Sequence, residues 1–307
     1  MRLLYGGSGW LPIVDQLRAR LAASTEPALA GATLARWDRT APLAAVIGDV
    51  DVLLPSNAHV TAEVIAAAPR LRLIQQPAAG TDGIDRAAAA ARRIPICNAP
   101  AANHVSVAEH ALYLLLALAR RAPLARRALG EREIGVPLGV ELAGKTLGVI
   151  GVGRTGAALA ERARALGMAV IELRRGATAP DRAAFFAACH AVSVHCPLTP
   201  ETRGLVGADA FAALPPGALV VNCARGGVID RAALEAALAG GRLGGVGLDV
   251  WWDEPADPAD PLLADPRVLV TPHVAGSTEE AFGRIAEIAI GNVERLARGE
   301  PLHHRVG

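Results

Sequence analysis

Residues 145–176 contain the feature that most constrains the fold of this chain, a glycine-rich turn between an apolar run and an alanine-rich stretch. Thr146–Ile150 and Met168–Leu173 are short and apolar, which predicts two strands. Ala157–Leu166 lies between them and has the apolar spacing of a helix. The segment therefore predicts a strand, a helix and a second strand, which is the repeating unit of parallel α/β proteins.

Gly151, Gly153 and Gly156 form the pattern G-x-G-x-x-G between the first strand and the helix. The first glycine permits a tight turn, the second lets a pyrophosphate approach the backbone, and the third lets the helix pack closely on the strand. The N-terminus of the following helix offers free N–H groups and a partial positive charge to phosphate groups. The glycines, with strand and helix in this order, predict a dinucleotide-binding site.

The end of the second strand is expected to contact the adenosine ribose of the dinucleotide. Glu172 stands about where an acidic residue would bind the 2′-hydroxyl of NAD, but it lies inside the apolar strand. Arg174 and Arg175 follow where the strand ends, and their guanidinium groups suit a 2′-phosphate. We therefore expect NADP(H) to be favoured and NAD(H) to be possible. The alternative is a ribose bound by Glu172 beside two solvated arginines.

Length and charge exclude several classes of protein. At 307 residues the chain suits two domains, and a net charge of +1 without a basic block argues against a nucleic-acid partner. The longest strongly apolar run, Ala111–Ala119, is too short to span a bilayer, so no membrane partner is expected. The N-terminus lacks the pattern of a signal peptide. The four cysteines have no C-x-x-C spacing, which predicts reduced, buried thiols, no metal site and a cytoplasmic location.

Alternating apolar runs and Ala-, Leu- and Arg-rich stretches predict parallel α/β structure along the whole chain. The further strands expected are Arg2–Tyr5, Thr33–Trp37, Val52–Leu54, Leu71–Gln75, Ile94–Cys97, Ala191–Cys196, Leu219–Cys223, Val246–Val250 and Val268–Val270. Helices are expected at Pro12–Ala23 and Ser106–Arg121. The segment Arg121–Ala143 has weak periodicity, and it is either a subunit contact arm or a loop.

Three polar residues follow predicted strands of the second half. Arg225, Glu254 and His273 come after the third-last, second-last and last of these strands, and ligands of doubly wound sheets gather at such carboxyl ends. Arg225 could hold a carboxylate and polarise the neighbouring carbonyl. His273 could exchange the hydroxyl proton, with Glu254 fixing its tautomer and favouring its charged form. This set suits hydride transfer at a carbonyl beside a carboxylate, although each residue alone could be structural.

At these residues the chain resembles the D-isomer-specific 2-hydroxyacid dehydrogenases, and the likeness covers nearly the whole sequence. The matching motifs are Ala78–Asp85, Val107–Leu112, Gly151–Gly156, His195–Thr202, Asn222–Asp230, Gly247–Pro255 and Thr271–Gly276. The resemblance implies two Rossmann-like doubly wound parallel-sheet domains with an active-site cleft between them. It assigns residues 1–100 and 274–307 to a substrate-binding domain and residues 101–273 to a dinucleotide-binding domain.

The resemblance also implies the roles of individual residues. Arg225, Glu254 and His273 would be catalytic, and the substrate would contact Ala79, Gly80, Arg225 and His273. The expected cofactor contacts are Gly151, Gly153, Arg154, Thr155, Gly156, Arg174, Arg175, His195, Pro197, Cys223, Ala224, Asp249 and Gly276. Tyr5, Gly6, Gly7, Ser8, Ser56 and Asn57 occupy strand-end loops expected to touch the substrate side chain. The family is usually dimeric through elements like residues 103–143, which predicts a homodimer, although Glu131–Val140 lacks the usual aromatic residue.

These observations predict an NAD(P)-dependent D-2-hydroxyacid dehydrogenase acting on a small 2-oxo acid such as glyoxylate or hydroxypyruvate. The family often has Asp where Arg174 stands, which supports NADP(H). The alternatives are phosphoglycerate, formate or phosphite dehydrogenase on the same scaffold, or a non-catalytic protein that senses NAD(H).

Overall fold

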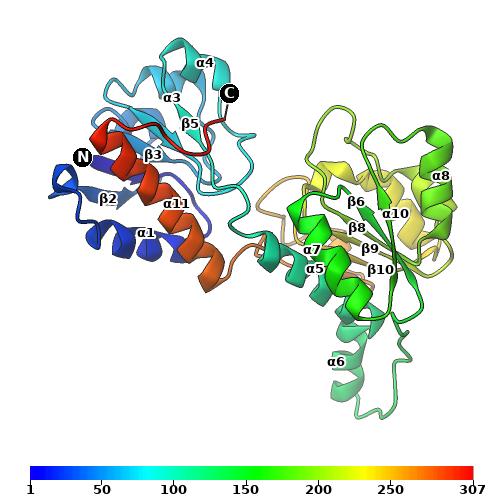
Figure 1. The fold of residues 1–307 in the computed structure, drawn as a ribbon. Helices are drawn as coiled ribbons and strands as arrows, with labels where there is room; N and C mark the ends of the chain where they lie inside the picture. The colour runs from blue at the N-terminus through cyan, green and yellow to red at the C-terminus, as the bar shows by residue number, and fades with distance from the viewer. Residues whose placement is uncertain (307) are drawn as a thin grey trace. The chain divides into compact units, whose positions relative to one another are not determined.

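The computed structural model describes residues 1–306, which form two compact units (Figure 1). One unit comprises Met1–Asn103 and residues 277–306, and the other comprises His104–Gly276. Each unit contains one parallel sheet with helices on both faces. The predicted fold class of two parallel α/β domains is thereby confirmed.

The first unit is built on a five-stranded parallel sheet in the order β2-β1-β3-β4-β5. Leu4 of the interior strand β1 is paired with Ala35 on one side and Leu53 on the other. This order places the first strand inside the sheet, so the chain direction reverses beside β1, as in doubly wound folds. The strands are β1 (Arg2–Tyr5), β2 (Thr33–Arg36), β3 (Val52–Leu54), β4 (Leu73–Gln75) and β5 (Ile96–Cys97).

Helices cover both faces of this sheet, because successive strand residues point to opposite sides. Leu3 and Tyr5 pack with helices α1 (Pro12–Ala22) and α11 (Glu279–Arg298), whereas Leu4 packs on the opposite face. The helices of that opposite face are α2 (Leu43–Val46), α3 (Ala62–Ala66) and α4 (Arg86–Ala91). The last helix of the chain therefore completes a core that begins with its first strand.

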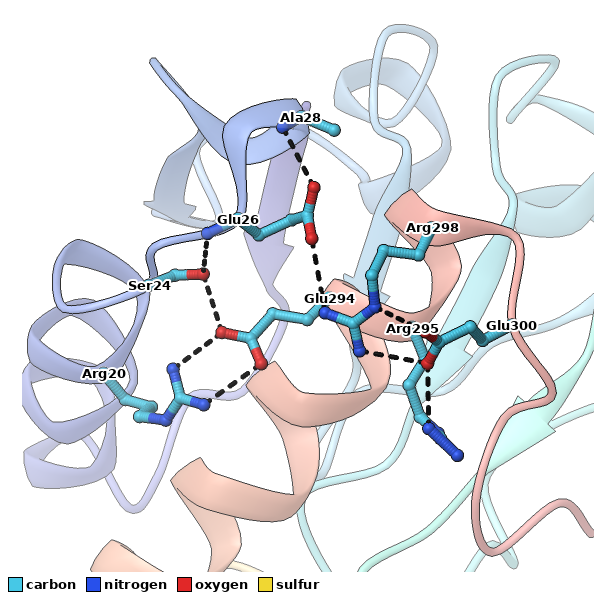
Figure 2. Close-up of polar contacts among 8 residues, drawn as sticks. All are labelled: Arg20, Ser24, Glu26, Ala28, Glu294, Arg295, Arg298 and Glu300. Atoms are coloured by element: carbon cyan, nitrogen blue, oxygen red, sulfur yellow. Dashed lines mark hydrogen bonds and ion pairs between the residues drawn. The ribbon is translucent and has the colours of Figure 1, made fainter.

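A polar network joins α1 to α11 (Figure 2). Two nitrogens of Arg20 lie 2.9 Å and 3.1 Å from the carboxylate oxygens of Glu294, which also accepts a 2.6 Å hydrogen bond from Ser24. Arg298 contacts Glu26 at 3.3 Å and Glu300 at 2.7 Å. Because the Arg20 and Glu294 side chains are only 22% and 15% exposed, water screens their paired charges less than it would screen an exposed pair.

The second unit is built on a six-stranded parallel sheet in the order β11-β10-β9-β8-β6-β7. Strand β6 lies between β7 and β8, so the chain turns in opposite directions on its two sides. Such a reversal is the position where doubly wound sheets bind ligands. The strands are β6 (Thr146–Ile150), β7 (Ala169–Leu173), β8 (Ala191–Val194), β9 (Ala218–Asn222), β10 (Leu243–Leu248) and β11 (Val268–Val270).

Two groups of helices cover the two faces of this sheet. The first, α5 (His104–Ala119) and α7 (Arg154–Ala165), packs on Leu147 and Val149 of β6. The second consists of α8 (Ala179–Ala188), α9 (Ala208–Ala213) and α10 (Arg231–Ala239), which pack on the other face. Three short 3₁₀ turns complete the chain: η1 (Pro27–Leu29), η2 (Gly226–Val228) and η3 (Pro261–Ala264).

The structure corrects several predicted boundaries. Helix α7 begins at Arg154, directly after Gly153, so Thr155 and Gly156 lie inside it and not in the turn. Helix α5 ends at Ala119 because Arg121 adopts a left-handed backbone conformation (φ 51°). The segment left open as an arm or loop begins with a helix, α6 (Ala122–Gly130), which extends away from the sheet of its unit (Figure 1).

Four predicted strands have the predicted bounds, and the other predicted elements differ at their ends by one to three residues, where the strand pairing or helical hydrogen bonds stop. Three cysteines are buried as expected, whereas Cys223 is partly exposed, and all four are free thiols. Within residues 1–306 no helix combines the length and apolar character needed to cross a membrane.

Candidate active site

The predicted cofactor-binding residues follow the carboxyl ends of the second unit's strands, and three of them, Arg154, Thr155 and Gly156, form the start of helix α7. The glycine turn follows β6, the two arginines follow β7, and the predicted catalytic residues follow β9, β10 and β11. Parallel strands end at the same edge of a sheet, and β6 and β8 flank the reversal of strand order there. Chain segments up to 125 residues apart, from Gly151 to Gly276, are therefore brought to one edge by the fold.

The glycine turn is closely packed at its first and third glycines and open at the second, Gly153. Gly151 has φ 89°, and a Cβ on it would meet the backbone of Cys196; a Cβ on Gly156 would meet the carbonyl oxygen of Gly151. At Gly153, by contrast, a Cβ would meet nothing within 4 Å. Gly153 also caps α7, so the first N–H groups of that helix lie at the turn. The turn therefore fits the pyrophosphate of a dinucleotide, held by backbone amides and the helix N-terminus.

The two arginines after β7 lie beside carboxylates. Arg174 lies 2.5 Å from Glu172, and Arg164 of α7 lies 3.8 Å from the same carboxylate. The side chain of Arg174 is 73% exposed. The charge of Arg175 acts on Glu201, whose pKa lies below its ordinary value mainly through a hydrogen bond with Thr199. The ribose end of the predicted site thus contains cations that carboxylates partly neutralise.

His195 and Pro197 follow β8. Nε2 of His195 lies 2.8 Å from Oγ of Ser193, and burial lowers the pKa of His195 to about 4. The imidazole is therefore neutral near neutral pH. Pro197 accepts a 2.7 Å hydrogen bond from Oγ1 of Thr202 through its carbonyl oxygen, which closes the turn behind it.

Glu254 and His273 form a hydrogen-bonded pair, as the sequence predicted. Nδ1 of His273 lies 2.7 Å from Oε2 of Glu254, and the N–H of Trp251 donates to Oε1 of Glu254 at 3.0 Å. Burial acts to raise the pKa of Glu254. The net shift is nevertheless downward, because the ionised carboxylate is stabilised by the hydrogen bond and charge of His273, by the Trp251 amide and by the charge of Arg225. An ionised Glu254 accepts a hydrogen bond from the N–H at Nδ1 of His273, which fixes the proton of that ring nitrogen.

Arg225 lies in a loop that the side chain of Asn222 holds. Oδ1 of Asn222 accepts from the N–H of Ala224 at 2.9 Å, and Nδ2 donates to the carbonyl oxygen of Arg225 at 2.9 Å. Asn222 is fully buried, and Nη1 of Arg225 donates to the carbonyl oxygen of Ala224 at 2.7 Å. Next to Arg225, a Cβ on Gly226 would meet the backbone of Trp251, so these two loops are in close contact. Arg225 thus lies near the Glu254 loop, and its charge reaches the Glu254 carboxylate.

Asp249 has a structural function beside the predicted cofactor contact. Its carboxylate, 1% exposed, accepts hydrogen bonds from Oγ1 of Thr271 at 2.6 Å and from the amides of Val274 and Ala275 at 2.8 Å and 2.9 Å. It therefore holds the loop that carries His273 and precedes Gly276. The predicted contact of Asp249 with a nicotinamide stays a prediction.

Sequence reasoning missed Asn222, Thr271 and His110 as residues that hold this site. All three lie inside the matching motifs. Asn222 ends β9 and Thr271 directly follows β11, so a polar side chain at the end of an apolar strand was the available signal. His110 lies within helix α5, with Nε2 2.9 Å from Oγ1 of Thr271, and no strand end marked it.

The predicted substrate contacts Ala79 and Gly80 lie in the first unit, in the loop after β4. The carbonyl oxygen of Ala79 accepts a 2.8 Å hydrogen bond from Asn98, which fixes the loop. At the ends of β1 and β3 the hydroxyl of the buried Tyr5 lies 3.0 Å from Oγ of Ser56. These strand-end loops thus form hydrogen-bonded structures at the sheet edge of their own unit.

Comparison with known proteins identifies the family. A sequence model described as "D-isomer specific 2-hydroxyacid dehydrogenase, NAD binding domain" matches residues 112–275. The chain belongs to this family. The match confirms the resemblance seen in the motifs and shows that the second unit contains an NAD-binding domain.

Individual D-2-hydroxyacid dehydrogenases and their relatives share both sequence and structure with the chain. D-3-phosphoglycerate dehydrogenase of Archaeoglobus fulgidus is 40% identical over 267 residues, which are 83% of this chain and 51% of that protein. Glyoxylate reductase of Korarchaeum cryptofilum is 37% identical over 78% of this chain and 77% of its own length. The crystal structure of the TT0316 protein from Thermus thermophilus superposes with a TM-score of 0.88 at 32% identity over the whole of both chains. The chain spans about half the length of the phosphoglycerate dehydrogenases that it matches.

Proposed function

We propose that this protein reduces a small 2-oxo acid to the D-2-hydroxy acid and prefers NADPH to NADH. The observation that carries this proposal is the 2.7 Å pair of His273 and Glu254, with the charge of Arg225 acting on the same carboxylate. These groups follow strands of the sheet that also carries the dinucleotide turn. An acid/base pair, a fixed cation and a hydride donor are together what reduction of a 2-oxo acid requires.

The proposed roles follow from charge and hydrogen-bond geometry. The reduced nicotinamide, when bound, supplies a hydride to the carbonyl carbon of the substrate. Arg225 holds the substrate carboxylate and polarises the carbonyl oxygen, because its guanidinium stays charged and presents a planar pair of donors. His273 gives the proton on Nε2 to that oxygen. Glu254 keeps the Nδ1 proton in place and stabilises the charged imidazole before transfer.

The preference for NADPH rests on the end of β7. Arg174 stands where the motif comparison expects Asp, and its exposed guanidinium can pair with a 2′-phosphate after leaving Glu172. Arg175 adds a second cation at the same strand end. Ala79 and Gly80 are proposed to bind the substrate carboxylate through their amides, and the loops of Tyr5 and Ser56 to contact the rest of the substrate.

A panel of 2-oxo acids, each with NADPH and with NADH, tests the proposal. The purified protein should consume NADPH with at least one small 2-oxo acid such as glyoxylate or hydroxypyruvate. Oxidation of 3-phosphoglycerate, formate or phosphite, with no 2-oxo acid reduced, would instead favour the corresponding dehydrogenase. Cofactor binding without turnover of any substrate would favour a protein that senses NAD(H).

We further propose that two copies of the chain associate through α6 and the segment after it. Leu129, Ile134 and Leu138 are 77%, 98% and 83% exposed, and Tyr113 and Leu116 of α5 are also exposed. Large exposed apolar side chains grouped in this way are typical of an interface between proteins. The cytoplasmic location predicted from the sequence stays a prediction that the four free thiols support.

Light scattering on Leu138→Asp tests the association. The variant should have the mass of one chain where the parent protein has the mass of two. Leu166→Asp, which changes a 41% exposed leucine beside α7 in the same unit, serves as the control and should keep the parent mass. A parent protein with the mass of one chain would contradict the proposal.

A further inference from the structure

His273 has a backbone conformation that its own residue type disfavours. Its φ is 54°, in the left-handed region, which residues other than glycine rarely adopt unless the surrounding structure holds them there. The carboxylate of Asp249 holds the two residues that follow, because the amides of Val274 and Ala275 donate to Oδ1 and Oδ2, respectively. The orientation of His273 therefore depends on where the Asp249 carboxylate lies.

Thr271 connects that carboxylate to helix α5. Oγ1 of Thr271 donates to Oδ1 of Asp249 at 2.6 Å and lies 2.9 Å from Nε2 of His110. A hydroxyl carries one proton, and here the carboxylate accepts it. His110 must therefore be the donor to Thr271, which assigns its proton to Nε2 and gives the relay one direction, from His110 through Thr271 to Asp249.

The environment of His110 suits this direction. Burial lowers the pKa of His110, while the charge of Asp249 acts in the opposite sense, and the side chain is 17% exposed. Near neutral pH the ring is then neutral and has one N–H to donate. Nε2 is also 3.5 Å from Oδ1 of Asp249, so the ring faces the carboxylate as well as the hydroxyl.

We propose that His110 is a positioning residue for His273, because its hydrogen bond through Thr271 fixes the Asp249 carboxylate that holds residues 271–275. His110 belongs to α5, which packs on the sheet, so the relay ties the loop to a rigid element. The kinetic part of this inference rests on the proposed dehydrogenase function, whereas its structural part does not.

Hydrogen exchange of the Val274 and Ala275 amides tests the structural part without substrate. His110→Leu removes the donor and should speed exchange of both amides about tenfold. His110→Gln keeps an N–H donor and should stay within about threefold of the parent protein. Glu109→Gln, on the neighbouring exposed residue of the same helix, is the control and should leave exchange unchanged. Exchange in His110→Leu equal to that of the parent would overturn the proposal.

A double-mutant cycle tests the kinetic part. His110→Leu and Thr271→Val should each lower kcat about tenfold while NADPH affinity changes less than about threefold, and the double variant should lose no more than either single one. A double variant that loses the product of the two effects would show that the residues act independently, and the relay would be refuted. If His110→Leu does not fold, the exchange of the Val274 and Ala275 amides in Thr271→Val decides, and exchange equal to that of the parent would overturn the proposal. Altered exchange in a protein that reduces no 2-oxo acid would refute the proposed function and leave the relay standing.

Discussion

Replacing Arg174 with Asp should convert the proposed preference for NADPH into a preference for NADH. Arg174 is 73% exposed and must leave Glu172, so its contact with a 2′-phosphate stabilises the complex by about 1 kcal/mol, below the usual range for charge-assisted hydrogen bonds. An Asp at this position would repel the phosphate by about 1 kcal/mol in water at a separation of about 5 Å. It would also accept a hydrogen bond from the 2′-hydroxyl of NADH, which adds about 1 kcal/mol.

These effects together change the relative transition-state stabilisation by about 3 kcal/mol, which corresponds to a change on the order of 100-fold. The measured quantity is the ratio of kcat/KM with NADPH to kcat/KM with NADH at a saturating 2-oxo acid. Arg164→Gln is the control, because Arg164 also faces Glu172 but lies 3.8 Å away on α7. Its ratio should change less than about threefold.

An unchanged ratio in Arg174→Asp would refute the assignment of Arg174 to the 2′-phosphate. In that case Glu172 would be the residue that reads the ribose, as the alternative interpretation holds. The variant Glu172→Gln distinguishes the two assignments. If Arg174 binds the 2′-phosphate, kcat/KM with NADPH should stay equal or rise; if Glu172 binds the 2′-hydroxyl, kcat/KM with NADH should fall.

Three further outcomes are expected. His273→Ala should lower kcat about a thousandfold, with NADPH affinity by fluorescence titration near that of the parent; equal loss of both would contradict its role as acid. Gly153→Val should weaken NADPH binding about tenfold or more without lowering the thermal midpoint, because the added side chain enters open space in the turn, and unchanged binding would show that phosphate lies elsewhere. The hydrogen bond from Arg20 lowers the pKa of Glu294 below its ordinary 4.5. The ionised Glu294 therefore stabilises the folded state above pH 4.5, and this contribution is lost as the pH falls through the lowered pKa. Glu294→Gln should therefore be less stable to urea by about 1 kcal/mol near neutral pH, and this difference should shrink as the pH falls through the lowered pKa; a difference that does not shrink in acid would refute this account.

The strands were predictable because they are short apolar runs buried in a parallel sheet. Arg2–Tyr5, Val52–Leu54, Thr146–Ile150 and Val268–Val270 have the predicted bounds, since side chains on both faces must be apolar there. The sequence prediction began α7 three residues too late, because glycine at position 156 has a low helix propensity. The structure needs glycine there inside the helix, since a Cβ would meet the carbonyl oxygen of Gly151.

The parts of the candidate site that were predictable are the polar residues that directly follow a strand, because parallel strands end at the same edge of a sheet. The pair of Glu254 and His273 follows from strand order alone, because β10 and β11 are neighbours in the sheet. The contact of His110 with Thr271 does not follow, since it joins positions 161 residues apart through side chains of a helix and a loop. Periodicity gives the face of α5 that is buried, but it does not show which hydroxyl the partly buried imidazole of His110 contacts.

The position of α11 bears on how the protein folds during synthesis. The chain leaves the first unit at Asn103 and returns to it at Ser277, and the returning helix supplies Phe282, Ile285 and Ile290 to that unit's core. On the ribosome, the second unit emerges complete while the first still lacks one side of its core, so the usual order of maturation from the N-terminus is reversed. Residues 1–103 therefore keep apolar surface uncovered until residues 277–306 are translated, and we expect the nascent chain to be most prone to aggregation during this interval.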